Sequence, residues 1–187
     1  MWWRNPHALA RAVRLAIVLA AAGLTAGCFE PLYGSRPSVN GEGVHDKLGA
    51  VEIPPIPARE GTPESRLAVA MRNALQFDLN GGAGAGSPTH RLTVTLTDTQ
   101  TTVMIDITSG RPTAQIDGVR ATFQLIEIAT GKVVLRDTTY ARVGTDAPGA
   151  QQRFAQQRAL RDAEDRAILV AAESIRNRLA SYFVAGT

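Results

Sequence analysis

The chain has 187 residues, of which 44% are hydrophobic, 20% are charged and only 5% are aromatic. This length suits one domain with its own core. The single cysteine excludes a disulfide framework within the chain. Because aromatic residues are so few, we expect the core to consist mainly of Ala, Val, Leu and Ile.

The N-terminal segment has the layout of an export signal that ends in a lipid attachment site. Three arginines (Arg4, Arg11 and Arg14) precede an apolar run from Leu15 to Ala26, and Gly27-Cys28 follows. A basic, then apolar, then small-residue order is typical of secretory signals. The run is shorter than the roughly 20 residues that a membrane-spanning helix needs. We therefore predict that residues 1–27 are a lipoprotein signal peptide and that the Cys28 thiol becomes lipidated.

Export changes the charge balance of the chain. The full sequence has 20 Lys+Arg and 17 Asp+Glu, and removal of the three arginines before Cys28 leaves 20 − 3 = 17 basic against 17 acidic residues. A neutral mature chain gives no support for a nucleic acid partner. Phe29, rather than an aspartate, follows Cys28, which by analogy with enterobacterial sorting favours transfer to the outer membrane. Several acyl chains on Cys28 would hold the protein stably in the inner, periplasmic leaflet.

The mature chain begins with a segment that is rich in Pro, Gly and Ser. We predict a lipidated tether over residues 28–47, because this segment has little hydrophobic periodicity. A folded domain is expected over residues 48–187. It opens with a short strand candidate, Leu48–Ile53, which the prolines of Pro54-Pro55-Ile56-Pro57 end.

A helix is predicted between residues 62 and 80. Thr62 is placed to cap free backbone N–H groups, Pro63 suits the first helical position, and Asn80-Gly81 is a typical helix end. The expected buried face consists of Leu67, Ala70, Met71, Ala74 and Leu75. The glycine-rich segment 81–86 is interpreted as a loop rather than a phosphate-binding turn, because no Gly-Lys-Ser/Thr follows it.

The middle of the domain alternates apolar and polar side chains, which predicts strands with one buried and one wet face. The expected buried set is Leu92, Val94, Leu96, Val103, Ile105, Ile107, Val119, Ala121, Phe123, Leu125, Val133, Leu135, Thr139, Ala141 and Val143. The expected wet set is Thr93, Thr95, Thr97, Arg120, Thr122, Gln124, Arg136, Thr138, Tyr140 and Arg142. Ala129-Thr130-Gly131-Lys132 separates the last two strands as a turn.

A long amphipathic helix is predicted at the C-terminus, from about Gln151 to Phe183. Its apolar stripe is Leu160, Ala163, Ala167, Ala171, Ile175, Leu179 and Tyr182. The polar face offers the (i, i+4) pairs Arg158–Asp162 and Asp162–Arg166. The predicted fold is therefore α+β, with a sheet of about four strands and two helices packed on one face.

No pattern of catalytic or metal-ligating residues is present, so we expect no enzyme, no metal and no cofactor. His45 and His90 have no neighbours at metal-ligand spacing and are interpreted as solvated loop histidines. Asp98 and Asp106 are interpreted as solvated or turn-capping carboxylates rather than a catalytic pair. No Gly-x-Ser-x-Gly motif occurs in the chain.

Three segments together resemble the lipopolysaccharide-assembly lipoprotein family LptE, in its alphaproteobacterial form. They are the motif CFEPLYG that begins at Cys28, the strand segment Thr139-Tyr140-Ala141, and the C-terminal helix with Asp162–Ala167 and Ile175–Leu179. The PLYG element just after the cysteine is the most specific of these. The resemblance implies two helices against a four-stranded sheet, which agrees with the fold expected from the pattern.

The resemblance also implies a function. LptE-like proteins lie at the inner side of the outer membrane, plug the large β-barrel LptD one-to-one, and take part in delivering lipopolysaccharide to the outer leaflet. Cys28 carries over as the lipidation site. Pro31, Leu32, Tyr33 and Gly34 match the motif and are expected to direct the tether along the lower rim of the barrel.

Contact with lipopolysaccharide is expected at Arg91, Arg120, Arg136 and Arg142, only because they fall on the wet face and arginine pairs well with phosphate. The alternative is that these are ordinary solvated charges. A second functional hypothesis is an auxiliary periplasm-facing lipoprotein of a transport or substrate-capture system, with the polar face as a small-ligand site. A spacer of the cell envelope would show repeats or low complexity, and the sequence shows neither.

Overall fold

The computed structural model describes residues 43–82, 84–105, 107, 108, 110, 112–146 and 153–186. In chain order the elements are α2 (Val44–Gly49), β1 (Val51–Glu52), α3 (Pro63–Asn80), β2 (His90–Ile105), β3 (Pro112–Glu127), β4 (Val133–Asp146) and α4 (Arg153–Ala185). The predictions made for the signal peptide, for Cys28, for Pro31, Leu32, Tyr33 and Gly34 and for Asp106 lie outside the described residues.

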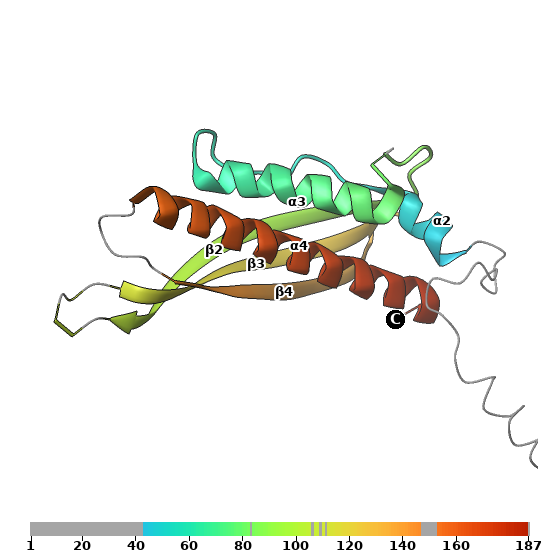
Figure 1. Ribbon diagram of the computed structural model, residues 1–187. Helices are drawn as coiled ribbons and strands as arrows, with labels where there is room; N and C mark the ends of the chain where they lie inside the picture. Colours follow the sequence, from blue (N-terminus) through green and yellow to red (C-terminus); the bar gives the residue numbers. More distant parts are fainter. Residues whose placement is uncertain are drawn as a thin grey trace, which may run out of the picture. The chain divides into compact units, whose positions relative to one another are not determined.

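The four strands form one sheet in the order β1-β2-β3-β4. β1 pairs with β2 in parallel, and the two long hairpins β2–β3 and β3–β4 are antiparallel. Figure 1 shows α3 and α4 lying side by side over one face of this sheet, while no helix of the described residues lies on the opposite face. The predicted α+β architecture, with two helices on one face, is confirmed.

A short helix, α2, replaces the last part of the predicted tether. Val44 and Leu48 of α2 are buried in the core, so residues 44–47 belong to the folded domain rather than to a tether. The helix ends at Gly49, and only Val51 and Glu52 form the first strand, which was expected over Leu48–Ile53. The apolar spacing of Val44 and Leu48 fits one helical face, which is the pattern that the tether prediction overlooked.

The start and end of α3 fall where the sequence predicted them. Pro63 occupies the first turn, and Gly81 takes the left-handed conformation (φ 65°) that ends the helix. The capping role predicted for Thr62 is wrong, because its hydroxyl donates to the carbonyl oxygen of Arg59 at 2.7 Å and makes no cap hydrogen bond. The Thr62 carbonyl instead accepts from the backbone N–H and the hydroxyl of Ser65.

The helices α3 and α4 run in the same direction (Figure 1). Arg66, near the start of α3, pairs with Glu164 and with Asp165, the latter at 2.5 Å, in the first half of α4. Small buried side chains let α4 approach its neighbours closely, and they are Ala163, Ala167, Ala171, Ala172 and Ala180. Of the apolar stripe predicted for the C-terminal helix, Ala163, Ala167, Ala171, Ile175 and Leu179 are buried and Tyr182 packs against the core, whereas Leu160 is only partly buried. Of the two predicted (i, i+4) pairs, Arg166–Asp162 forms at 2.9 Å.

The predicted alternation holds along most of the sheet. Leu92, Val94, Val119, Ala121, Phe123, Leu125, Leu135 and Ala141 all face the helices and are buried. At the turn end of β4 the prediction is wrong for Val133, which is 45% exposed, while Val134 packs against the core. The cause is a register shift between Leu125 and Ile126 of β3, which pair with Leu135 and Val133 of β4. This irregularity breaks the alternation of buried and exposed side chains at the start of β4.

The prediction is also wrong at the far end of the β2–β3 hairpin. Val103, Ile105 and Ile107 were expected on the buried face but are 56%, 57% and 99% exposed. Two register shifts, before and after Met104, interrupt the period of two there. In Figure 1 this end of the hairpin twists away from the two helices, which agrees with the exposure of these side chains.

His90 lies at the start of β2 and is half-buried rather than solvated, which corrects the sequence interpretation. Its ring meets the ring of Phe183 edge-on, with 5.2 Å between centroids, and its Nδ1 lies 2.8 Å from the Thr89 hydroxyl. Burial is the main cause that lowers the pKa of His90 below its ordinary 6.5; the charge of Lys47 lowers it further, while Glu127 opposes the shift.

This lowered pKa predicts a pH-dependent stability. The unfolded chain, in which the pKa of His90 is near 6.5, binds a proton more readily than the folded chain. The contribution of neutral, half-buried His90 to stability is therefore complete above pH 6.5 and is lost as the pH falls from 6.5 toward the folded pKa. We expect His90→Gln to flatten the dependence of the unfolding midpoint on pH between 7.5 and 5. His45→Gln, at an exposed position of α2, is the matched control. If the unfolding midpoint depended on pH equally steeply in His90→Gln and in the unaltered chain, His90 would not be the source of the pH dependence.

Candidate functional site

The sheet face that α3 and α4 leave uncovered carries the polar side chains that the sequence predicted. Cross-strand register aligns them in rows: Thr93, Gln124 and Arg136; Thr95, Thr122 and Thr138; Thr97, Arg120 and Tyr140; Thr99, Gly118 and Arg142. The hydroxyls of Thr122 and Thr138 lie 3.2 Å apart within one of these rows. We call this surface the outer face.

The outer face is hollowed where Gly118 interrupts the rows of side chains. The hollow has a volume of about 360 Å³ and is lined around Gly118 by Thr99, Thr101, Ile116, Arg120, Tyr140 and Arg142. A Cβ atom at position 118 would meet the Thr99 hydroxyl at 2.9 Å and the Ala141 carbonyl oxygen at 3.3 Å. A glycine inside a strand often marks such a close approach, and here its missing side chain leaves the floor of the hollow open.

Two arginines flank the hollow from neighbouring strands. The Arg120 guanidinium lies over the Tyr140 ring, 4.9 Å from its centroid. Such a cation–π contact holds the guanidinium plane while leaving its N–H groups free to donate. Arg142 lies on the other side of Gly118, and its Cγ would be 3.5 Å from a Cβ at that position. Both arginines are exposed at the surface.

The structure separates the four arginines that the sequence grouped together. Arg120 and Arg142 line the hollow, whereas Arg91 pairs with Glu52 at 3.0 Å and Arg136 lies exposed two rows beyond Arg120. Among the side chains that the structure describes, no carboxylate forms an ion pair with Arg120, Arg136 or Arg142. The positive charge of the hollow is therefore not neutralised by the described part of the chain.

The outer face becomes apolar toward the end of the β2–β3 hairpin. Ile116 borders the hollow, and Ala114 follows on the same side of β3 with Met104 opposite it. Met104 is 60% exposed, and Val103 and Ile105 beside it are exposed to a similar degree. The sequence analysis expected Val103 and Ile105 on the buried face, but both are exposed, and register shifts on either side of Met104 interrupt the alternation there.

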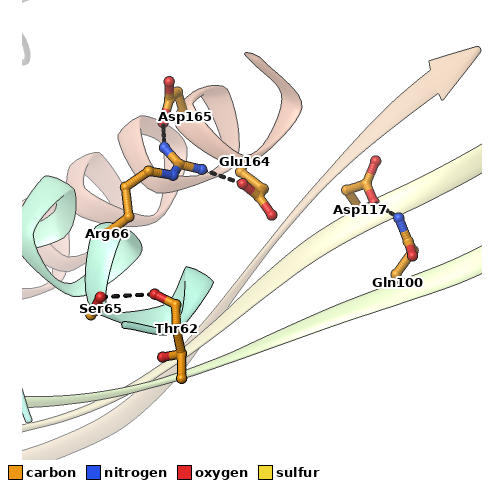
Figure 2. A network of polar contacts seen from close by, with 7 residues as sticks. All are labelled: Thr62, Ser65, Arg66, Gln100, Asp117, Glu164 and Asp165. Atoms are coloured by element: carbon orange, nitrogen blue, oxygen red, sulfur yellow. Dashed lines mark hydrogen bonds and ion pairs between the residues drawn. The ribbon is translucent and has the colours of Figure 1, made fainter. Parts of the chain in front are cut away.

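The polar groups under the helices have a different arrangement (Figure 2). Asp117 is only 3% exposed, yet its carboxylate accepts from the Gln100 side-chain amide at 3.0 Å and from the Thr145 hydroxyl at 2.7 Å. Arg66 is occupied by Glu164 and Asp165. The Asp117 group therefore connects β2, β3 and β4, and the Arg66 group connects α3 and α4.

Other kinds of site find little support in the described part of the chain. No group of three or more His, Cys, Asp or Glu residues is arranged to hold a metal ion there. No helix among the described residues is long and apolar enough to cross a membrane. Asp98 is exposed on β2, and the catalytic pairing with Asp106 that the sequence analysis set aside cannot be followed because Asp106 lies outside the described residues.

The domain thus has one sheet face covered by helices and another face that is polar, arginine-bearing, hollowed and open to a ligand. Residues 48–179 match the family described as LptE, lipopolysaccharide-assembly. The chain belongs to this family of lipopolysaccharide-assembly lipoproteins, as its motifs suggested. The family is non-enzymatic.

Solved structures of lipoproteins share the fold. A candidate lipoprotein from Caulobacter crescentus CB15 is 20% identical, with a TM-score of 0.58 over 77% of this chain and 97% of that one. The rare lipoprotein B from Shewanella oneidensis is 15% identical, with a TM-score of 0.52 over 72% and 96%. A minor lipoprotein from Acinetobacter baumannii is 16% identical, with a TM-score of 0.51 over 72% and 90%. No curated protein sequence matches the chain significantly.

Proposed function

We propose that this protein is an outer-membrane lipoprotein that plugs an LptD-like β-barrel and takes part in delivering lipopolysaccharide to the outer leaflet. Membership of the LptE family over residues 48–179 is the observation that carries this proposal. In this account acyl chains on Cys28 hold the protein in the periplasmic leaflet. The Pro31-Leu32-Tyr33-Gly34 motif runs along the lower rim of the barrel, and the folded domain enters the lumen.

The polar outer face supports a place inside a water-filled barrel. Its threonines and arginines are hydrogen-bonding groups that remain solvated in such a lumen, whereas contact with hydrocarbon would leave them unpaired. The domain also exposes large apolar side chains on its helices, including Val69 and Phe77 on α3 and Leu169 on α4. Apolar exposure of this kind is typical of surfaces that meet a partner.

Lipopolysaccharide contact is proposed at the outer face. Arg120 and Arg142 flank a hollow and have no carboxylate partner among the described side chains. Arginine donates two parallel hydrogen bonds to a phosphate, and these charge-assisted bonds are roughly twice as strong as neutral ones. Arg136 remains a candidate on the same face, and the ion pair with Glu52 makes Arg91 the weakest of the four.

The proposal predicts an export defect when the protein is removed. We expect its depletion to lower the amount of lipopolysaccharide that a membrane-impermeant label reaches at the cell surface, while total lipopolysaccharide is maintained. Re-expression of the unaltered chain should restore the surface signal. Unchanged surface labelling after full depletion would contradict a role in delivery and favour the substrate-capture alternative.

Charge reversal of the hollow predicts a selective loss of this function. We expect Arg120→Glu with Arg142→Glu to restore less surface lipopolysaccharide than the unaltered chain, because like charges then oppose the phosphates. The matched control is Arg158→Glu with Arg161→Glu, two exposed arginines of α4. The labelling assay in depleted cells compares the two variants at equal protein levels. Full restoration by the double variant in the hollow would show that these arginines are solvated charges without a role.

A further inference from the structure

One margin of the sheet is an unpaired strand edge. Among the described strands β4 pairs only with β3, and the pairing runs in unbroken register from Leu135 to Asp146. In an antiparallel ladder the residues of a strand alternate in the neighbour that they bond to, so roughly half of the backbone N–H and C=O groups of β4 point away from β3. Figure 1 shows β4 at this margin of the sheet. These outward groups can accept one more strand.

The edge of β4 lacks most of the devices that keep sheet edges from pairing. Strand edges are usually blocked by proline, lysine, bulges or inward-pointing charges. β4 contains neither proline nor lysine, and no register shift interrupts it beyond Leu135. Asp137, on the helix side of β4, is neutralised by Arg178 of α4, with 2.9 Å between Oδ2 and Nε. The opposite margin differs, because β1 covers the first residues of β2 and two register shifts break the far end of β2.

The side chains next to this edge are cationic. Arg136 and Arg142 are exposed on the outer face of β4, and their spacing in the strand corresponds to about 20 Å. Thr138 and the 56% exposed Tyr140 lie between them. No carboxylate among the described side chains forms an ion pair with either arginine. A strand added to β4 would place its own side chains directly opposite these, where opposite charges stabilise the pair and like charges destabilise it.

We propose that the free edge of β4 binds an extended segment of the barrel protein, which adds to the sheet as a further strand. The segment carries carboxylate side chains opposite Arg136 and Arg142. This inference rests on the proposed function and adds to it the place and the manner of one contact with the barrel.

Two other occupants of the edge fit less well. Two copies of β4 paired antiparallel about Thr139, with their outer faces aligned, would place Arg136 opposite Arg142, and like charges there oppose pairing. The predicted tether joins the domain at α2, just before β1, which lies at the opposite margin of the sheet. Pro31 and Pro37 of that tether have no N–H group to donate to a strand ladder.

The test is photo-crosslinking in cells that express the full chain and the barrel protein. Thr138→p-benzoyl-phenylalanine and Tyr140→p-benzoyl-phenylalanine are compared, and the crosslinked residues of the partner are mapped by mass spectrometry. We expect both to reach one segment of the barrel protein, at residues about two positions apart, as the period of a paired strand requires. Thr95→p-benzoyl-phenylalanine, on the same face but on β2, is the control and should not reach that segment.

Charge variants then test the two arginines. Arg136→Glu with Arg142→Glu should lower the crosslink from position 138 about ten-fold, because two attractive cross-strand pairs become repulsive. Lysine in place of the opposing carboxylates of the barrel segment should restore the crosslink, which it could not do for a misfolded variant. Arg158→Glu with Arg161→Glu, at exposed or half-exposed positions of α4, reverses the same number of charges and is the matched control. Failure of the lysine exchange to restore the crosslink would overturn the charge pairing.

The remaining outcomes separate the added strand from the proposed function. Crosslinks to lipopolysaccharide alone, to a second copy of the chain, or to scattered sites on the barrel wall would overturn the added strand. If the unaltered chain co-purifies with the barrel but position 138 gives no crosslink to it, the added strand is wrong while the proposed function stands. If the unaltered chain retains no barrel, the proposed function itself is wrong.

Discussion

Replacement of Phe123 by alanine is expected to lower the free energy of unfolding by about 3–5 kcal/mol. Phe123 is 1% exposed in the middle of β3 and is the largest fully buried side chain of the domain. The core consists mainly of aliphatic side chains, so removal of the ring leaves a cavity under the helices. Thermal unfolding followed by circular dichroism should show a midpoint lower by roughly 10 °C.

The matched control for this prediction is Phe77→Ala on α3, because Phe77 is 71% exposed. A surface substitution of this kind usually changes the free energy of unfolding by no more than about 0.5 kcal/mol. Comparable losses of stability for the two variants would contradict the core arrangement described here. The same pair also tests the partner surface, since Phe77→Ala should weaken association with the barrel if that side chain contacts it.

Replacement of Cys28 by alanine is expected to remove the acyl anchor that holds the chain in the outer membrane. Each buried CH₂ of an acyl chain contributes about 0.8 kcal/mol, and several chains on one residue make attachment effectively permanent. We expect Cys28→Ala to move from the outer-membrane fraction to the periplasmic fraction, or to be retained with an uncleaved signal. Ser35→Ala, in the predicted tether, should leave the distribution unchanged.

The intact mass of the mature chain provides a direct check on this prediction. The unaltered protein should begin at residue 28 and carry the mass of its acyl groups there. A mature chain that begins elsewhere, or that carries an unmodified thiol at Cys28, would contradict the lipoprotein interpretation. Residual membrane association of Cys28→Ala would measure how strongly the barrel retains the domain without its anchor.

Local sequence signals were sufficient for the main elements of the fold. Pro63 and Gly81 place the two ends of α3, because a ring-fixed φ suits a first helical turn and a left-handed residue ends the last one. The spacing of Ala163, Ala167 and Ala171 placed the core face of α4. Such features depend only on nearby residues, so they can be read before any tertiary contact is known.

The misplaced residues depend on register instead. Val103 and Ile105 lie an odd number of residues from Leu92 and Val94, so a strict period of two puts them on the opposite face from that pair. The shifts around Met104 interrupt the alternation as well, and both side chains are exposed. The prediction that Val133 is buried is wrong because another register shift, between Leu125 and Ile126, interrupts the alternation at the other end of the sheet. A bulge is set by how two strands pair, and that pairing leaves no mark in either strand alone.

The candidate site was predicted only in outline. Alternation placed Arg120 and Arg142 correctly on the outer face, yet it gave Arg91 equal weight because the ion pair with Glu52 forms through the parallel β1–β2 contact. The hollow itself depends on Gly118 lying between Thr99 and Arg142. The cross-strand register that brings these three residues together is not contained in the alternating pattern.

The central claim is that this LptE-family chain is the plug of an outer-membrane barrel. The most direct measurement is affinity purification of the full, tagged protein from detergent-solubilised outer membrane, with quantification of what co-purifies. The account predicts a single large β-barrel protein in equal amount to the tagged chain. Recovery of a free lipidated monomer without any barrel partner would contradict it and would favour the substrate-capture lipoprotein.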